Sequence, residues 1–133
     1  MRILVISDSH GNTRNIERAV ESQPEANIII HLGDGADDIV DLEFVYRDKQ
    51  FYQVAGNCDW GSSLPLEGEL KVADKTIFFV HGHEYRVKTN LQQIKMEARK
   101  RNADIVLFGH THLPITEYDD ELYLLNPGSL QYA

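Results

Sequence analysis

A chain of 133 residues is long enough to bury one core, so we expect a single domain over residues 1–133. The composition, 42% hydrophobic and 26% charged, is typical of a globular protein and excludes disordered and fibrous classes. The formal net charge of −8 argues against long nucleic acid as a partner, because proteins that bind it carry basic surfaces.

The cysteine content and hydropathy indicate a cytoplasmic protein. Cys58 is the only cysteine, which excludes an intramolecular disulfide and gives no support for secretion. No leader-like segment precedes Arg2, and no apolar stretch approaches the roughly 20 residues that a membrane helix needs. We therefore expect no membrane contact.

Short apolar runs rich in β-branched or aromatic residues recur along the chain. They are too short for helices and are typical of buried strands. The predicted strands are Ile3–Ile6, Ile28–Ile30, Phe51–Val54, Ile77–Val80 and Ile105–Phe108.

Helical patterns separate several of these runs. Asn12 is placed to cap the first helix, a second is expected to begin after Gly35, and Thr89 with Gln92 forms a capping box for the third. Their apolar stripes are Ile16, Ala19 and Val20; Ile39, Leu42 and Tyr46; and Leu91, Ile94 and Ala98.

Two antiparallel hairpins complete the expected elements. They pair Glu67–Val72 with Lys75–Val80 about Ala73 and Asp74, and Ile115–Tyr118 with Leu122–Leu125 about Asp119 and Asp120. Alternating strands and helices followed by hairpins predict an α/β fold with mixed sheets, helices outside and two sheets packed together.

A potential metal ligand follows each of the five apolar runs, at the strand ends where ligands bind in α/β sheets. The candidates are Asp8 and His10, Asp34, Asn57, His81, and His110 with His112. Each alone is weak, because an Asp after a strand is usually a turn residue. Five in register indicate a common site, where two divalent cations would offset the repulsion between Asp8 and Asp34.

Imidazole and carboxylate without thiolate favour Mn²⁺, Fe²⁺, Zn²⁺, Co²⁺ or Ni²⁺ over a structural zinc cage, with Mn²⁺ expected first and Mg²⁺ also compatible. In Asp8-Ser9-His10 and His110-Thr111-His112, alternate side chains point the same way if the backbone is extended. Glycines at 11, 33, 35, 56, 82 and 109 fit loops that crowd close to ions or substrate.

These motifs resemble those of the calcineurin-like metallophosphoesterases, and specifically the small YfcE-like phosphodiesterase branch. In the family's order they are Asp8-Ser9-His10, Gly33-Asp34, Gly56-Asn57-Cys58-Asp59, His81-Gly82 and Gly109-His110-Thr111-His112; Asn126-Pro127-Gly128-Ser129 also resembles that branch. The resemblance spans the chain and implies the two-sheet α/β sandwich of the metallophosphoesterase fold. Relatives continue with a further strand after Ser129, so this chain is either a minimal member or a truncated one.

The resemblance also implies a mechanism and a division of ligands. One metal would be held by Asp8, His10 and His112, the other by Asn57, His81 and His110, and Asp34 would bridge both. Hydroxide between the metals would attack phosphorus, with Asp34, Asn57 and His81 acting through the metals. A small phosphate ester is the expected substrate.

Departures from the broader family disfavour a phosphoprotein phosphatase. Protein phosphatases carry a histidine after Gly-Asn and an arginine soon after Gly-Asp, whereas this chain has Cys58 and Gly35-Ala36-Asp37-Asp38. His83 is a candidate substrate contact if its loop reaches the site. With no base paired to them in the local sequence, Ser9, Ser129 and Cys58 are read as structural or supporting residues.

Two rival functions are open. The retromer scaffold subunit shares the fold without catalytic competence, although all seven family positions here carry residues able to bind metal. The second rival function is that of a nuclease or nucleotide-specific phosphoesterase, in which Trp60 or Tyr85 would stack on a base. We favour the simpler interpretation that these two aromatic residues cover the edge of the core. His31 is expected to pack beside the sheet, and a dimer is left open.

Overall fold

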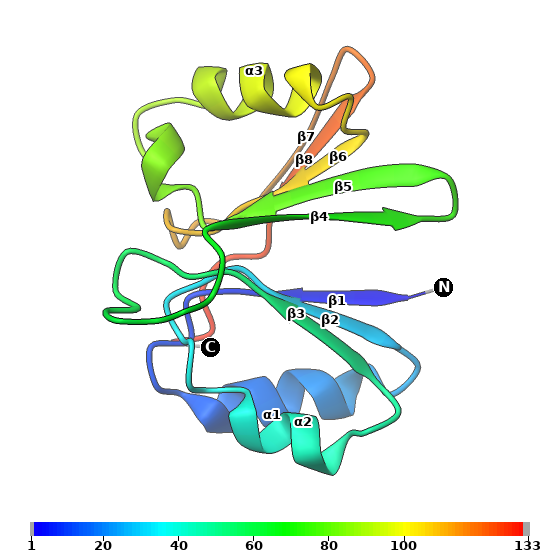
Figure 1. The fold of residues 1–133 in the computed structure, drawn as a ribbon, viewed down its shortest axis with the longest axis vertical. Helices are drawn as coiled ribbons and strands as arrows, with labels where there is room; N and C mark the ends of the chain where they lie inside the picture. Colours follow the sequence, from blue (N-terminus) through cyan, green and yellow to red (C-terminus); the bar gives the residue numbers. More distant parts are fainter. Residues whose placement is uncertain (1, 132–133) are drawn as a thin grey trace.

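The structure, a computed structural model, describes residues 2–131 and has four layers (Figure 1). One outer layer holds α1 (Thr13–Ser22) and α2 (Val40–Val45), and the other holds α3 (Gln92–Lys100). Between them lie β1 (Ile3–Ile6), β2 (Ile28–His31) and β3 (Gln50–Gln53) in one sheet, and in the other β4 (Glu67–Val72), β5 (Lys75–Val80), β6 (Ile105–Leu107), β7 (Ile115–Asp119) and β8 (Leu122–Asn126). The predicted two-sheet α/β sandwich is confirmed.

The two sheets differ in topology. The first has the order β1-β2-β3 and is parallel throughout, with Ile3 opposite Ile28 and Ile28 opposite Gln50. The second has the order β4-β5-β6-β8-β7, in which β5, β6 and β8 run parallel and β4 and β7 pair antiparallel at the edges. Every predicted strand is present, with ends that shift by two residues at most; β5 begins at Lys75, as the hairpin prediction had it.

Alternation along the strands divides the core into three clusters, because successive side chains point to opposite faces. In β2, Ile28 and Ile30 pack between the sheets while Ile29 packs under α1 and α2. In β5, Phe79 joins the layer between the sheets and Phe78 packs toward α3. Strands with two buried faces explain why the runs are continuously apolar rather than alternating.

The first helix follows the prediction and the other two begin later than expected. The Asn12 side chain accepts a hydrogen bond from the Asn15 backbone amide and caps α1. α2 starts at Val40 instead of soon after Gly35, since the intervening residues form turns. The predicted Thr89–Gln92 capping box is wrong: α3 begins at Gln92, whose amide donates to the Asn90 side chain.

Two turns also differ in detail from the prediction. The first hairpin turns at Ala73 and Asp74 as expected, and both residues have positive φ. The second turns at Asp120 and Glu121 rather than at Asp119 and Asp120, because β7 extends through Asp119. Within residues 2–131, no helix combines the length and apolar character required to cross a bilayer.

Candidate metal centre

The residues predicted as metal ligands converge where the parallel strands of both sheets end. Asp8 and His10 follow β1, Asp34 follows β2 and Asn57 follows β3, while His81 follows β5 and His110 with His112 follow β6. The sheets are packed so that these loops, distant in sequence, meet at one edge of the sandwich (Figure 1). All seven candidates lie in this one cluster.

One group of donor atoms comes from Asp8, His10 and His112, which lie within 4.8 Å of one another. Asp8 Oδ1 is 3.2 Å from His112 Nε2 and 3.8 Å from His10 Nε2, and the two imidazole nitrogens are 3.4 Å apart. Ligands bonded to one zinc-sized ion at about 2.1 Å lie roughly 3 to 3.5 Å apart. The spacing therefore fits a common ion.

A second group combines Asp34, His81 and His110, with Asn57 beside it. His81 Nε2 lies 3.3 Å from Asp34 Oδ2, 3.1 Å from His110 Nδ1 and 3.0 Å from Asn57 Oδ1. Asp34 Oδ2 is also 3.6 Å from His10 Nε2, so this carboxylate faces both groups. That position is the one expected of a bridging ligand.

Second contacts orient several of these donors. His81 Nδ1 is 2.8 Å from the Leu32 carbonyl and donates to it, so in the neutral ring the Nε2 lone pair is directed at the cluster. Asp8 Oδ2 accepts from the Ser7 hydroxyl and the His110 amide, and Asp34 Oδ1 accepts from the Cys58 amide. In both carboxylates, one oxygen is held by the protein and the other faces the cluster.

The backbone conformation at these residues is unusual and corrects one expectation. Five candidates have φ in the left-handed region, namely Asp8, His10, Asp34, His110 and His112. The extended backbone expected for Asp8-Ser9-His10 and His110-Thr111-His112 is therefore wrong. Such conformations cost about 1 to 2 kcal/mol per residue for L-amino acids and persist where the surroundings hold them, commonly at functional sites.

The Asp59 carboxylate holds the loop that carries Asp34. Its Oδ2 accepts from the amides of Asp34 at 2.8 Å and Gly56 at 2.7 Å, and its Oδ1 accepts from those of Gly35 and Ala36, both at 2.9 Å. Four amides on one carboxylate lock the loops after β2 and β3 together. In the sequence, Asp59 stands only as the last residue of Gly56-Asn57-Cys58-Asp59, and no role was predicted for it.

Asn126 performs a similar task for the loop after β6. Its side-chain amide donates to the Gly109 carbonyl and the Thr111 hydroxyl, and its oxygen accepts from the Gly128 amide. The Ser129 hydroxyl donates to the Asp8 carbonyl, so the segment after β8 supports both neighbouring loops. The sequence did carry a signal for this role, because Asn126 is a polar residue that ends an apolar strand just before Pro127 and Gly128.

Only some of the glycines near the cluster lie so close to it that a side chain would not fit. A Cβ at Gly109 would meet the Asp8 carboxylate and the Ser7 hydroxyl, and one at Gly56 would meet the Asp34 carboxylate. At these positions only glycine leaves room for the candidate ligands. Gly11 does not crowd anything within 4 Å, so the expectation of close approach is wrong there.

Electrostatics couple the imidazoles to the carboxylates. Burial raises the pKa of Asp34, but the hydrogen bond and charge of His81 outweigh it and hold that pKa well below its usual range. Burial lowers the pKa of His81, but the bond to Asp34 and the charge of Asp8 raise it overall. Burial and His81 lower the pKa of His110 to about 4, so its ring is neutral and able to bind metal at physiological pH.

The surroundings of one carboxylate oxygen of Asp8 show whether these residues fit a cation. Asp8 is fully buried, and its Oδ1 has no hydrogen-bond partner among the described residues. A buried carboxylate oxygen without a partner is costly, and a divalent ion in the Asp8, His10 and His112 group would satisfy it. The residues present therefore fit the metal that the donor chemistry implies.

His83 and Cys58 lie beside the cluster. The His83 ring, in a short 3-10 helix over His83–Tyr85, has its centroid 5.5 Å from that of His81 and 6.1 Å from that of His110. Its loop thus brings it to the site. Cys58 is exposed and its thiol lies near His10 and Asp34, but partial desolvation and the Asp34 charge raise the pKa of the thiol.

His31 is fully buried and belongs to neither donor group. Its Nε2 lies 3.0 Å from the Ser9 hydroxyl, and its Nδ1 accepts from the Gly33 amide. Ser9 also donates to Asp38, so its hydroxyl is engaged in structure. His31 was expected to pack beside the sheet, and the structure places it at the end of β2 with its ring packed against the Ser9 loop.

The burial of His31 predicts a pH effect on stability. Burial lowers the pKa of His31 to about 4, so below its unfolded pKa of about 6.5 the unfolded state binds more protons than the folded state. The free energy of unfolding should fall as the pH drops from about 6.5 to about 4. Below about pH 4, His31 should contribute no further pH dependence. Urea unfolding measured across this pH range should show that the free energy of unfolding depends less on pH in His31→Gln than in wild type. An equal pH dependence in the two proteins would contradict His31 as its source.

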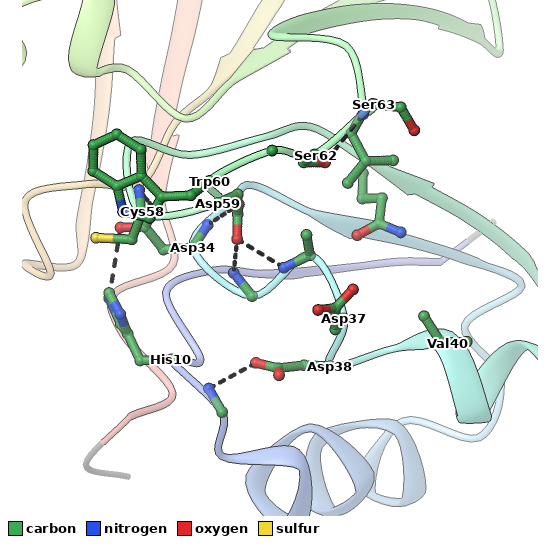
Figure 2. A pocket seen from close by; sticks show the side chains of 16 residues that line it. His10, Asp34, Asp37, Asp38, Val40, Cys58, Asp59, Trp60, Ser62 and Ser63 are labelled. Atoms are coloured by element: carbon green, nitrogen blue, oxygen red, sulfur yellow. Dashed lines mark hydrogen bonds and ion pairs between the residues drawn. The ribbon is translucent and has the colours of Figure 1, made fainter.

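An open pocket of about 780 Å³ adjoins the cluster at His10 and Asp34. Figure 2 shows Cys58 and Trp60 on the side that carries Asp34 and His10, and Asp37 and Val40 at the side next to α2. Trp60 is 90% exposed, so the expectation that it covers the core edge is wrong.

Tyr85, in contrast, packs against the core as expected. Its ring meets Phe78 edge-on with centroids 6.2 Å apart, and its hydroxyl donates to Glu67. Of the two aromatic residues considered for base stacking, only Trp60 faces the solvent beside the cluster.

A family model described as the calcineurin-like phosphoesterase superfamily domain matches residues 1–133. The chain belongs to this superfamily. This confirms the resemblance inferred from the five motifs. Relatives of the chain include proteins named as a metallophosphoesterase and as a phosphodiesterase.

One relative and two solved structures illustrate what the chain is similar to, and the third of them, below 25% identity, shows a likeness of fold alone. The probable metallophosphoesterase YsnB of Bacillus subtilis is 32% identical over 98% of this chain and 76% of its own. The structure of Yfce, a phosphoesterase from E. coli, is 25% identical with a TM-score of 0.73, covering 98% of this chain and 80% of that one. Vps29 from Entamoeba histolytica, solved in complex with Zn²⁺, is 23% identical with a TM-score of 0.78 and coverage of 97% and 74%.

Proposed function

We propose that the protein is a metal-dependent phosphodiesterase that hydrolyses small phosphate esters at the Asp34 cluster. The observation that carries the proposal is the pair of donor groups that share Asp34, with the buried Asp8 Oδ1 left for a cation. The names of two relatives support diester chemistry: phosphodiesterase YfcE of Escherichia coli, and phosphodiesterase MJ0936 of Methanocaldococcus jannaschii.

Two divalent ions, with Mn²⁺ expected first, would be held in the division that the resemblance implies. Asp8, His10 and His112 would hold one, Asn57, His81 and His110 the other, and Asp34 would contact both. When bound, such a pair lowers the pKa of water to near neutrality and offsets the charge that develops on phosphate oxygens.

The chain's own residues would orient and position rather than attack. Asp34 and His81 hold their donor atoms in place through the Cys58 amide and the Leu32 carbonyl. His83, whose pKa burial lowers, carries a buried Nδ1 without a hydrogen-bond partner among the described residues. We infer that His83 contacts the ester substrate from the side of His81 and His110.

The rival reading is a protein of the same fold that does not turn over substrate. Vps29 supports it as a fold neighbour, since its name refers to vacuolar protein sorting and not to an enzyme. The Zn²⁺ complex of Vps29 also means that metal binding alone cannot separate the two readings. The complete donor set, with Asp34 facing both groups, favours the enzyme.

The test is restoration of turnover by metal. Protein stripped with a chelator is given Mn²⁺ and then Ni²⁺, Co²⁺, Fe²⁺, Zn²⁺ and Mg²⁺ singly, and hydrolysis of bis-p-nitrophenyl phosphate is compared with that of p-nitrophenyl phosphate. We expect no activity in the stripped protein, recovery with Mn²⁺, and faster turnover of the diester. Binding of metal without turnover of either ester by any ion would overturn the enzyme reading.

A further inference from the structure

The pocket beside the donor cluster is built differently at its two ends. At one end lie His10 and Asp34, where the phosphate of a substrate would meet the ions of the proposed function. The other end is formed by the loop before α2, which carries Asp37, while Trp60 lies beside Cys58 on the side of Asp34 and His10 (Figure 2). Its volume of about 780 Å³ is within the range of small-molecule sites and exceeds what a phosphate alone would fill.

Trp60 is the feature of this pocket that a structural role does not explain. It is the only tryptophan of the chain, it is 90% exposed, and it lines the pocket while burying little surface of its own. Large aromatic rings exposed beside a cavity stack readily on planar ligands, since every nucleobase or aryl ring offers a π face.

The charges of the pocket restrict its occupant further. The lining includes Asp37, which is exposed, and Asp38, whose carboxylate accepts from the Ser9 hydroxyl and the Gly11 amide. The described residues of the lining include no lysine or arginine. A second phosphate placed there would meet carboxylates without a cationic partner, so the lining disfavours polyanionic groups.

Gln53 adds a hydrogen-bonding signal. It lines the pocket, and its side-chain oxygen is buried without a hydrogen-bond partner among residues 2–131. An unpaired buried acceptor destabilises the fold, and a ligand N–H or O–H would satisfy this one once the Gln53 side chain turns its oxygen toward the pocket that it lines. Ser63, also in the lining, offers a further polar group.

We propose that this pocket holds the planar, uncharged ring of one ester alcohol, stacked on Trp60, and so selects nucleobase or aryl phosphodiesters over aliphatic and polyphosphorylated esters. The proposal rests on the proposed function, because the cluster must hold the phosphate of the same ligand. It makes Trp60 a specificity-determining residue and Asp37 a source of discrimination against additional charge.

The lone tryptophan allows a direct binding test. Metal-loaded protein is titrated with the 5′-phosphate methyl esters of adenosine and of ribose, which differ only in the base, while Trp60 fluorescence is followed. We expect quenching by the adenosine ester, and binding at least about tenfold tighter than that of the ribose ester. Equal affinity of the two esters would overturn the proposal.

Variants locate the effect at Trp60. Inhibition constants of both esters are measured against bis-p-nitrophenyl phosphate for Trp60→Ala, Trp60→Phe and Phe44→Ala, the last an exposed aromatic outside the pocket. The preference for adenosine should fall to near one in Trp60→Ala, persist in part in Trp60→Phe and be unchanged in Phe44→Ala. A preference that survives Trp60→Ala would place the base elsewhere and overturn the assignment.

The charge and the function are tested separately. Wild-type protein should bind adenosine 3′,5′-bisphosphate more weakly than the adenosine ester, and Asp37→Lys should tighten the bisphosphate about fivefold; tighter wild-type binding of the bisphosphate would refute the charge discrimination. If no ester is hydrolysed, the affinities are measured by equilibrium dialysis, and a base preference lost in Trp60→Ala supports the pocket while the proposed function fails.

Discussion

Asp34→Asn is expected to lower kcat/KM for bis-p-nitrophenyl phosphate by about a thousandfold or more. Asp34 Oδ2 lies 3.3 Å from His81 Nε2 and 3.6 Å from His10 Nε2, so this one carboxylate reaches both donor groups. The amide would keep the shape of the side chain and the bond from the Cys58 amide but lose the negative charge. Steady-state kinetics with saturating Mn²⁺ provide the measurement.

Asp48→Asn is the matched control, since Asp48 is an exposed carboxylate in the turn before β3. It removes the same charge and should leave kcat/KM unchanged. Circular dichroism and a thermal melt of the stripped proteins should show that Asp34→Asn still folds. Turnover within a few fold of wild type in a folded Asp34→Asn protein would contradict the bridging role.

Asp59→Asn should lower the free energy of unfolding by about 3 kcal/mol or more and reduce activity as well. The carboxylate accepts from four backbone amides, and an asparagine would offer one oxygen and turn an N–H toward the remaining donors. The loop after β2 would then be free to relax, and the left-handed conformation of Asp34 would lose its support.

Asp37→Asn is the control for stability, because it changes an exposed carboxylate of the neighbouring loop. Urea unfolding of stripped protein separates the fold from metal binding, and calorimetric titration with Mn²⁺ then reports the site. We expect Asp59→Asn to lower both the free energy of unfolding and the affinity for Mn²⁺. Asp37→Asn should change the free energy of unfolding by less than about 0.5 kcal/mol. Equal stability of Asp59→Asn and wild type would show that the four bonds do not hold the loop.

Local rules account for the elements that were predicted well. Runs such as Ile28–Ile30 are apolar at every position because both faces of β2 are buried, and Asn12 caps α1 through a contact three residues away. Two of the failures lie where helices begin, and at the start of α3 the amide of Gln92 donates to the Asn90 side chain rather than to Thr89. Thr89 does not cap α3, and the turns after Gly35 delay α2 while Asp38 accepts from Ser9 and Gly11.

The convergence of the candidate metal ligands was foreseeable for a topological reason. Polar residues placed after parallel strands meet at the carboxyl edge, so Asp34 and His81 were expected together although 47 positions separate them. The sequence could not indicate which carboxylate oxygen faces the cluster, or that Asp8 Oδ1 lacks a partner. Those depend on hydrogen bonds from loops distant along the chain.

The sequence by itself therefore determined the class of fold, the superfamily and which residues are candidate donors, because periodicity and motif order can be read directly along the chain. Only the tertiary structure decided the left-handed backbone at Asp8 and Asp34, the role of Asp59 and the exposure of Trp60. Each of these follows from how the loops pack, since strain, amide partners and solvent access are set by neighbours in space.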